Sequence, residues 1–210
     1  MKNIIIASIL TILVNNCNGQ VQTKNNNLQK DIMEYFDINK YKNLKPNPKY
    51  SGGGNYLALN GDEIRVIGST DEGPTISIKK RDTPITLIYA YHKNNLLKAK
   101  GQQFYGMIYG TWKEYDEKGK MIKETNYDKD YKFSVTDLEK KMNEEYKVNI
   151  LDIKQTHSVS RFKGNYKIIC DPIAEVIFTE YEIDGTTGKT ISIKKVNGDT
   201  DEETIIFEKK

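Results

Sequence analysis

The chain has 210 residues, of which 37% are hydrophobic and 29% are charged, and this length allows one domain or two small ones. Its 14 tyrosines, six phenylalanines and one tryptophan can fill a core, which excludes a wholly disordered chain. The formal net charge of +3 is too small to indicate a nucleic-acid-binding protein.

Residues 1–19 are typical of a secretory signal peptide, with Lys2 ahead of the apolar run at 4–14. This run is shorter than the roughly 20 apolar residues of a membrane-spanning helix. Cys17 follows it and resembles the lipidated cysteine of bacterial lipoproteins, although Asn16 stands where that family has a small residue. We therefore expect lipidation at Cys17, and cleavage after Gly19 with loss of this cysteine is the alternative.

Residues 20–54 are predicted to form a polar tether, a helix and a glycine-rich hinge at 51–54. Apolar residues recur at helical spacing and predict a helix over 28–43. Pro46 is expected to prevent its continuation. The residues of the apolar stripe are Leu28, Ile32, Tyr35 and Phe36.

Residues 55–130 alternate apolar and polar side chains, which predicts an antiparallel β region. Asn60-Gly61 lies between two apolar runs, and this dipeptide favours a type I′ hairpin turn, in which both central residues have positive φ. Further strands are expected at 74–80, 85–92, 96–101 and 103–110.

The stretch GTWKEYDEKGKMIKETNY at 110–127 has a regular spacing of aromatic residues and glycines. The spacing resembles a repeat of the MORN type, including the variant of antitoxin-type proteins. The resemblance implies a β-hairpin with stacked aromatic rings that serves as scaffold or contact surface and performs no chemistry. The matching positions are Gly110, Trp112, Tyr115, Gly119 and Tyr127.

Residues 131–210 are predicted to form a helix followed by a β-meander. Ser134 and Asp137 have the spacing of a capping box at the start of a helix over 134–146. Strands are expected at 148–156, 166–170, 175–184, 189–197 and 203–209. This order, with the D-G-x-x-G-K turn at 184–189, resembles the PepSY module, an extracytoplasmic α+β unit linked in some proteins to protease inhibition.

No catalytic, metal or cofactor motif stands out. His92 and His157 lie far apart in the chain, without the spacing of zinc ligands, and Cys170 is expected to be a small buried hydrophobe. We expect no cofactor, no metal site and no catalytic residue. Some aromatic residues are expected to face a partner, because tyrosine and tryptophan are enriched at protein interfaces. The candidates are Tyr105, Tyr109, Trp112, Tyr115 and Tyr127.

The expected fold class is α+β, mainly antiparallel, with two helices, at about 28–43 and 134–146, and about ten strands. The expected function is that of a non-catalytic lipoprotein of the cell envelope that binds another protein. Its specific version is an immunity protein that neutralises a secreted toxin. The alternatives are an envelope hydrolase that uses carboxylates not yet identified and a PepSY-like protease inhibitor. An outer-membrane anchor facing the periplasm is expected, with a secreted or soluble periplasmic protein as the alternative.

Overall fold

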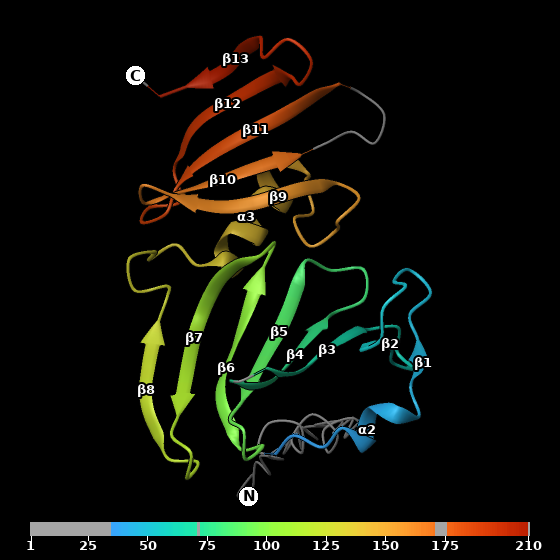
Figure 1. Cartoon of the computed structure of the whole chain (residues 1–210). Coiled ribbons are helices and arrows are strands. Elements are labelled where there is room, and N and C mark those ends of the chain that lie inside the picture. The colour runs from blue at the N-terminus through green and yellow to red at the C-terminus, as the bar shows by residue number, and fades with distance from the viewer. Residues whose placement is uncertain (1–34, 71, 171–175, 210) are drawn as a thin grey trace, which may run out of the picture.

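The computed structural model describes residues 35–70, 72–170 and 176–209. These residues form an eight-stranded and a five-stranded antiparallel sheet together with two helices (Figure 1). The α+β class with mainly antiparallel strands is thus confirmed in this broad sense, although 13 strands are present rather than about ten. The expected signal peptide, with Cys17, and most of the tether lie outside the described residues.

The eight-stranded sheet is a meander in which each strand pairs with its neighbours in the chain. Short connections and alternating side chains explain this order, because antiparallel strands need only a tight turn between them. The strands are β1 (Lys45–Pro46), β2 (Asn55–Leu57), β3 (Glu63–Thr70), β4 (Gly73–Lys79), β5 (Ile85–Tyr91), β6 (Leu97–Phe104), β7 (Met107–Tyr115) and β8 (Met121–Asn126).

The hairpin predicted around Asn60-Gly61 is confirmed, since β2 and β3 pair antiparallel. The predicted type I′ turn is wrong, because Gly61 has a φ of 87° while Asn60 is not among the residues with positive φ. The connection is longer than two residues, and the Ala58 amide donates to the Asp62 backbone oxygen at 3.0 Å. The Asn60 side chain donates to the Asp62 carboxylate at 3.0 Å, which favours this wider turn.

The second sheet has the strand order β13-β12-β11-β10-β9 and is preceded by helix α3. The helix confirms the predicted helix, and its capping box is formed: the Asp137 amide donates to Ser134 Oγ at 3.1 Å. The elements are α3 (Val135–Tyr146), β9 (Thr156–Phe162), β10 (Asn165–Cys170), β11 (Ile177–Asp184), β12 (Thr190–Asn197) and β13 (Glu203–Glu208).

The strand predicted at 148–156 is wrong, because most of this segment forms a loop and β9 begins only at Thr156. Side chains in the loop accept backbone hydrogen bonds and so compete with strand pairing. Asn149 Oδ1 accepts from the Leu151 amide at 3.0 Å, and Asp152 Oδ1 accepts from the Lys154 amide at 2.9 Å.

The helix predicted over 28–43 is wrong in its described part, where only the four residues of α2 (Asn39–Lys42) are helical. Tyr35 instead forms an antiparallel bridge with Leu96, and the Phe36 amide donates to the Asn95 backbone oxygen at 2.9 Å. Docking on β6 and the turn before it therefore overrides the helical spacing of the apolar residues.

Two hydrophobic clusters hold the molecule together. One lies on the inner face of the eight-stranded sheet and includes Ile76, Tyr89 and, from α2, Tyr41. The other contains Phe104 of β6 together with residues of α3 and the five-stranded sheet, so the two sheets share a core. Cys170 is buried in this second cluster, as expected. No helix among the described residues is long and apolar enough to cross a membrane.

Candidate binding surface

The β7–β8 hairpin carries most of the aromatic candidates, and its turn is fixed by one carboxylate. Asp116 Oδ1 accepts the amides of Lys118 and Lys120, each at 2.9 Å. These backbone hydrogen bonds hold the pKa of Asp116 below its usual value. Gly119 completes the turn with a φ of 79°, a conformation that glycine adopts without steric cost.

The eight-stranded sheet has one face that neither hydrophobic cluster covers. We call it the outer face. Side chains of alternate residues share a face, so the strand register shows which residues lie there. The register pairs Ser77 of β4 with Ile88 of β5, Ile88 with Gly101 of β6, and Trp112 of β7 with Thr125 of β8. None of these residues belongs to either cluster.

Trp112 lies directly on Gly101 on this outer face. A Cβ atom added at Gly101 would come within 2.0 Å of Trp112 Cε3, so only glycine leaves room for the ring. The indole is half-buried by this contact. Among the described residues, no acceptor is found for its Nε1–H. Trp112 therefore presents an apolar ring in a fixed position and an indole N–H that is available to donate a hydrogen bond.

Two of the other aromatic candidates face inward. Tyr105 donates its hydroxyl to the Thr156 backbone oxygen at 2.9 Å, and burial raises its pKa. Tyr109 packs edge-on against Phe104, with ring centroids 5.9 Å apart. Both belong to the cluster that joins the two sheets. The structure therefore assigns these two rings to holding the sheets together.

The remaining two candidates lie at the ends of the hairpin. Tyr115 packs on the inner face, with Lys100 Nζ 5.9 Å from its ring centroid. Tyr127 follows β8, and 42% of its surface is exposed. Its amide donates to the Gly110 backbone oxygen at 2.9 Å, which ties it to β7. The structure therefore does not gather the five aromatic residues into one patch.

Two edge strands, β8 and β13, expose apolar side chains that were not predicted from the sequence. Met121 and Ile122 of β8 are 48% and 63% exposed, and β13 exposes three consecutive large side chains. Alternation alone could not reveal them, because both faces of an edge strand can be open to solvent. The three β13 residues are Ile205, Ile206 and Phe207.

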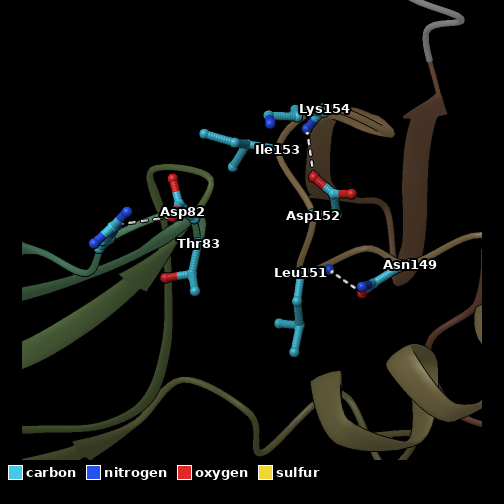
Figure 2. Close-up of a pocket in the computed structure, with 8 residues that line it drawn as sticks. Asp82, Thr83, Asn149, Leu151, Asp152, Ile153 and Lys154 are labelled. Atoms are coloured by element: carbon cyan, nitrogen blue, oxygen red, sulfur yellow. Dashed lines mark hydrogen bonds and ion pairs between the residues drawn. The ribbon is translucent and has the colours of Figure 1, made fainter. Parts of the chain in front are cut away.

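A wide, open hollow of about 580 Å³ lies between the β4–β5 turn and the loop that follows α3. Figure 2 shows Asp82 and Asp152 on its two sides. Arg81 Nε donates a hydrogen bond to Asp82 Oδ2 at 3.0 Å. Asp152 Oδ1 accepts a hydrogen bond from the Lys154 amide within its own loop. Each carboxylate thus has a local structural partner.

Neither histidine belongs to a reactive group in the described part of the chain. His92 Nε2 lies 2.9 Å from the Tyr115 backbone oxygen, and His157 is exposed. Within residues 35–70, 72–170 and 176–209, no group of three or more His, Cys, Asp or Glu side chains could hold a metal ion.

No family model, curated protein or solved structure matches this chain. The function is therefore inferred from the residues themselves, and above all from the outer face around Trp112.

Proposed function

We propose that this protein is a non-catalytic, lipid-anchored protein of the cell envelope that binds another protein on the outer face of its eight-stranded sheet. One observation carries the proposal: Trp112 lies fixed on Gly101, half-exposed, on a sheet face that no described cluster covers. Tryptophan is among the residues that most often dominate binding energy at protein interfaces.

The neighbours of Trp112 favour this use. Ile88 lies beside Gly101 on the adjacent strand and adds apolar area. On β7 and β8, Lys123 Nζ pairs with Glu114 Oε1 at 3.1 Å, which supplies a polar margin. An apolar centre with a polar rim is the common anatomy of a protein interface. The contact with Gly101 holds the Trp112 ring in place, so little conformational entropy of this side chain is lost on binding.

The specific form that we propose is neutralisation of a secreted toxin by an anchored immunity protein. Its support is the resemblance of 110–127 to an antitoxin-type repeat and the secretion-type start of the sequence. If no protein binds the outer face, both this specific form and the general proposal are contradicted.

The binding surface can be tested by site-specific photo-crosslinking in cells of the source organism. A benzophenone amino acid at Thr125, directly opposite Trp112, is expected to give one reproducible adduct. Trp112→Ser in the same chain should remove this adduct. The matched control places the benzophenone at Phe162, which is 62% exposed and lies on the other sheet. Equal adducts at both positions, or an adduct that survives Trp112→Ser, would refute the proposed surface.

The anchor has a separate test, because Cys17 lies outside the described residues. Labelling cells with a clickable palmitate analogue is expected to mark the parent chain and leave Cys17→Ala unmarked. Label on both chains, or on neither, would argue against lipidation at this cysteine. Either result leaves the binding surface to its own experiment.

A second candidate function is inhibition of an envelope protease, as in the PepSY resemblance. The exposed Ile205 and Phe207 of β13 favour it, because an edge strand can pair with the extended substrate groove of another protein. Purified chain is then expected to slow a periplasmic protease, and Ile205→Lys should abolish the effect. Undiminished proteolysis in the presence of the parent chain would exclude this candidate.

A further inference from the structure

The outer face also has a polar hollow of about 310 Å³ at its β2–β5 end. Two cross-strand rows form its floor. The register places Asn55, Arg65 and Ser77 side by side on β2, β3 and β4. The adjacent row consists of Glu63, Lys79 and Thr86 on β3, β4 and β5. Directly opposite residues in such rows have Cβ atoms about 4.5–5.5 Å apart, so the polar groups are close neighbours.

Four of these side chains have no hydrogen-bonding partner in the described part of the chain. They make no hydrogen bond or ion pair with another described residue, unlike the lysines of the β7–β8 hairpin. All four can donate hydrogen bonds, and two of them carry a positive charge. They are Arg65, Ser77, Lys79 and Thr86.

The one acidic residue of the hollow is already neutralised. Glu63 Oε1 accepts from Lys49 Nζ at 2.6 Å, and the Tyr50 hydroxyl donates to its other oxygen at 3.4 Å. The hydrogen bond from Lys49 holds the pKa of Glu63 below its usual value, so Glu63 stays ionised and paired. Lys79, directly opposite on β4, also lowers the pKa of Glu63 through its charge, so it shares this one carboxylate with Lys49. The hollow therefore keeps an excess of positive charge from Arg65 and Lys79.

A buried donor gives an independent observation at the same place. Asn47 lines the hollow and is only 3% exposed. Its Oδ1 accepts the Lys49 amide at 3.1 Å, which fixes the orientation of the side-chain amide. Its Nδ2 is buried and meets no acceptor among the residues that the structure describes. Buried donors are nearly always paired in folded proteins, so this group points to an acceptor supplied from outside the described residues.

We propose that this hollow binds an oxyanion, a phosphate or carboxylate group, through Arg65 and Lys79 with the hydroxyls of Ser77 and Thr86. Guanidinium groups bind both kinds of anion through two parallel hydrogen bonds. The ammonium and hydroxyl groups add further hydrogen-bond donors, and an oxyanion would supply the acceptors. Asn47 lies at the edge of this set, and a bound oxygen would give its Nδ2 the missing partner. The site stands independently of the protein partner proposed above.

The test is calorimetric titration of the full chain with inorganic phosphate and, separately, with acetate. Ionic strength is held constant with sodium chloride, because surface electrostatics are screened by salt. Both Arg65→Gln and Lys79→Gln are expected to weaken binding at least about ten-fold, as for loss of one charge-assisted hydrogen bond. Lys195→Gln removes an exposed lysine of β12 and serves as the matched control.

Binding of phosphate alone would identify a phosphate site, and comparable binding of acetate would identify a carboxylate site. The proposal is overturned if neither anion binds, or if Lys195→Gln weakens binding as much as Lys79→Gln. Arg65 and Lys79 are exposed, so their variants are expected to fold, and circular dichroism checks this directly.

Discussion

Replacing Gly101 with alanine should displace the indole of Trp112 without removing it. The new Cβ would lie 2.0 Å from Trp112 Cε3, and ordinary contact begins at 3.4 Å, so the ring must move by about 1.4 Å. Gly101 does not have a positive φ, so alanine causes no backbone strain there. The substitution thus isolates the packing of one aromatic ring on one backbone position.

Two opposing effects set the change in folding stability caused by Gly101→Ala. Overpacking of this kind costs about 1–3 kcal/mol, whereas alanine in place of a strand glycine gains about 0.5–1 kcal/mol. We expect Gly101→Ala to destabilise the fold by about 1–2 kcal/mol. In a Trp112→Ala background the clash is absent, and the same change should be neutral or stabilising. The double-mutant cycle should therefore show a coupling energy of about 2 kcal/mol.

Urea unfolding followed by circular dichroism measures all four chains of this cycle. Trp112 is the only tryptophan in the sequence, so its fluorescence also reports directly on the ring. Gly101→Ala should shift the emission to longer wavelength as the indole becomes more exposed to water. Gly68→Ala is the control, because its added Cβ meets nothing within 4 Å. An unchanged emission spectrum and zero coupling would refute the contact between Trp112 and Gly101.

Other substitutions test the buried polar groups. Asp62→Asn should cost about 2 kcal/mol, because it leaves Lys80 Nζ, 2.9 Å from the carboxylate, without its counter-charge. Burial alone would raise the pKa of Asp62, but hydrogen bonds from Lys80 and a backbone amide outweigh it and lower this pKa. The stabilisation from Asp62 is thus fully present above about pH 4 and lost as the pH falls through the lowered pKa. Urea unfolding measured at several pH values should show this loss in the parent chain and not in Asp62→Asn. Asp128→Asn should cost about 3 kcal/mol, because the Arg161 side chain is 8% exposed and would keep an unpaired charge; an unchanged melting temperature would contradict this. Burial raises the pKa of Cys170 to about 11, so at pH 8 a thiol reagent should react about a hundred-fold more slowly than with a free cysteine, in a chain whose other cysteine is serine. Rapid labelling of the native chain would show that Cys170 is accessible.

Local patterns in the sequence were sufficient for the β2–β3 and β7–β8 hairpins and for α3. The run at 85–92 alternates as the pleat of a strand requires, and it corresponds to β5. The single strand predicted at 103–110 is wrong, because the β6–β7 turn divides it at Tyr105 and Gly106, whose φ values are 51° and 81°. The capping box at Ser134 and Asp137 is satisfied within one turn of chain. These features depend on neighbours in sequence, which is why they could be predicted without knowing the tertiary structure.

The failures depend on contacts between distant segments. Tyr35 belongs to a run of apolar residues at helical spacing, yet it forms a β-bridge with Leu96. The sequence around Tyr35 contains no pattern that predicts this distant partner. In the same way, alternation separates Trp112 from Tyr109 and Tyr115, but it does not tell which face of the sheet stays open. Packing of α3 and of the segment around α2 on the other face decides this.

The contact between Trp112 and Gly101 was also beyond prediction. The register of β6 and β7 shifts between Lys100 and Gln102, so counting from the β6–β7 turn does not place Trp112 over the glycine. The polar hollow has a similar origin, because Arg65 and Lys79 become neighbours only when β3 and β4 pair in their particular register. A slip by one residue would send one of them to the apolar face.

The strict succession of strands in the larger sheet makes its length adjustable (Figure 1). Every pairing from β1 to β8 joins chain neighbours, so a hairpin inserted at a turn would extend the row without rerouting any strand already present. Duplication of one aromatic-glycine unit could therefore widen the platform in a single genetic step, while the shared core at Phe104 kept the smaller sheet in place.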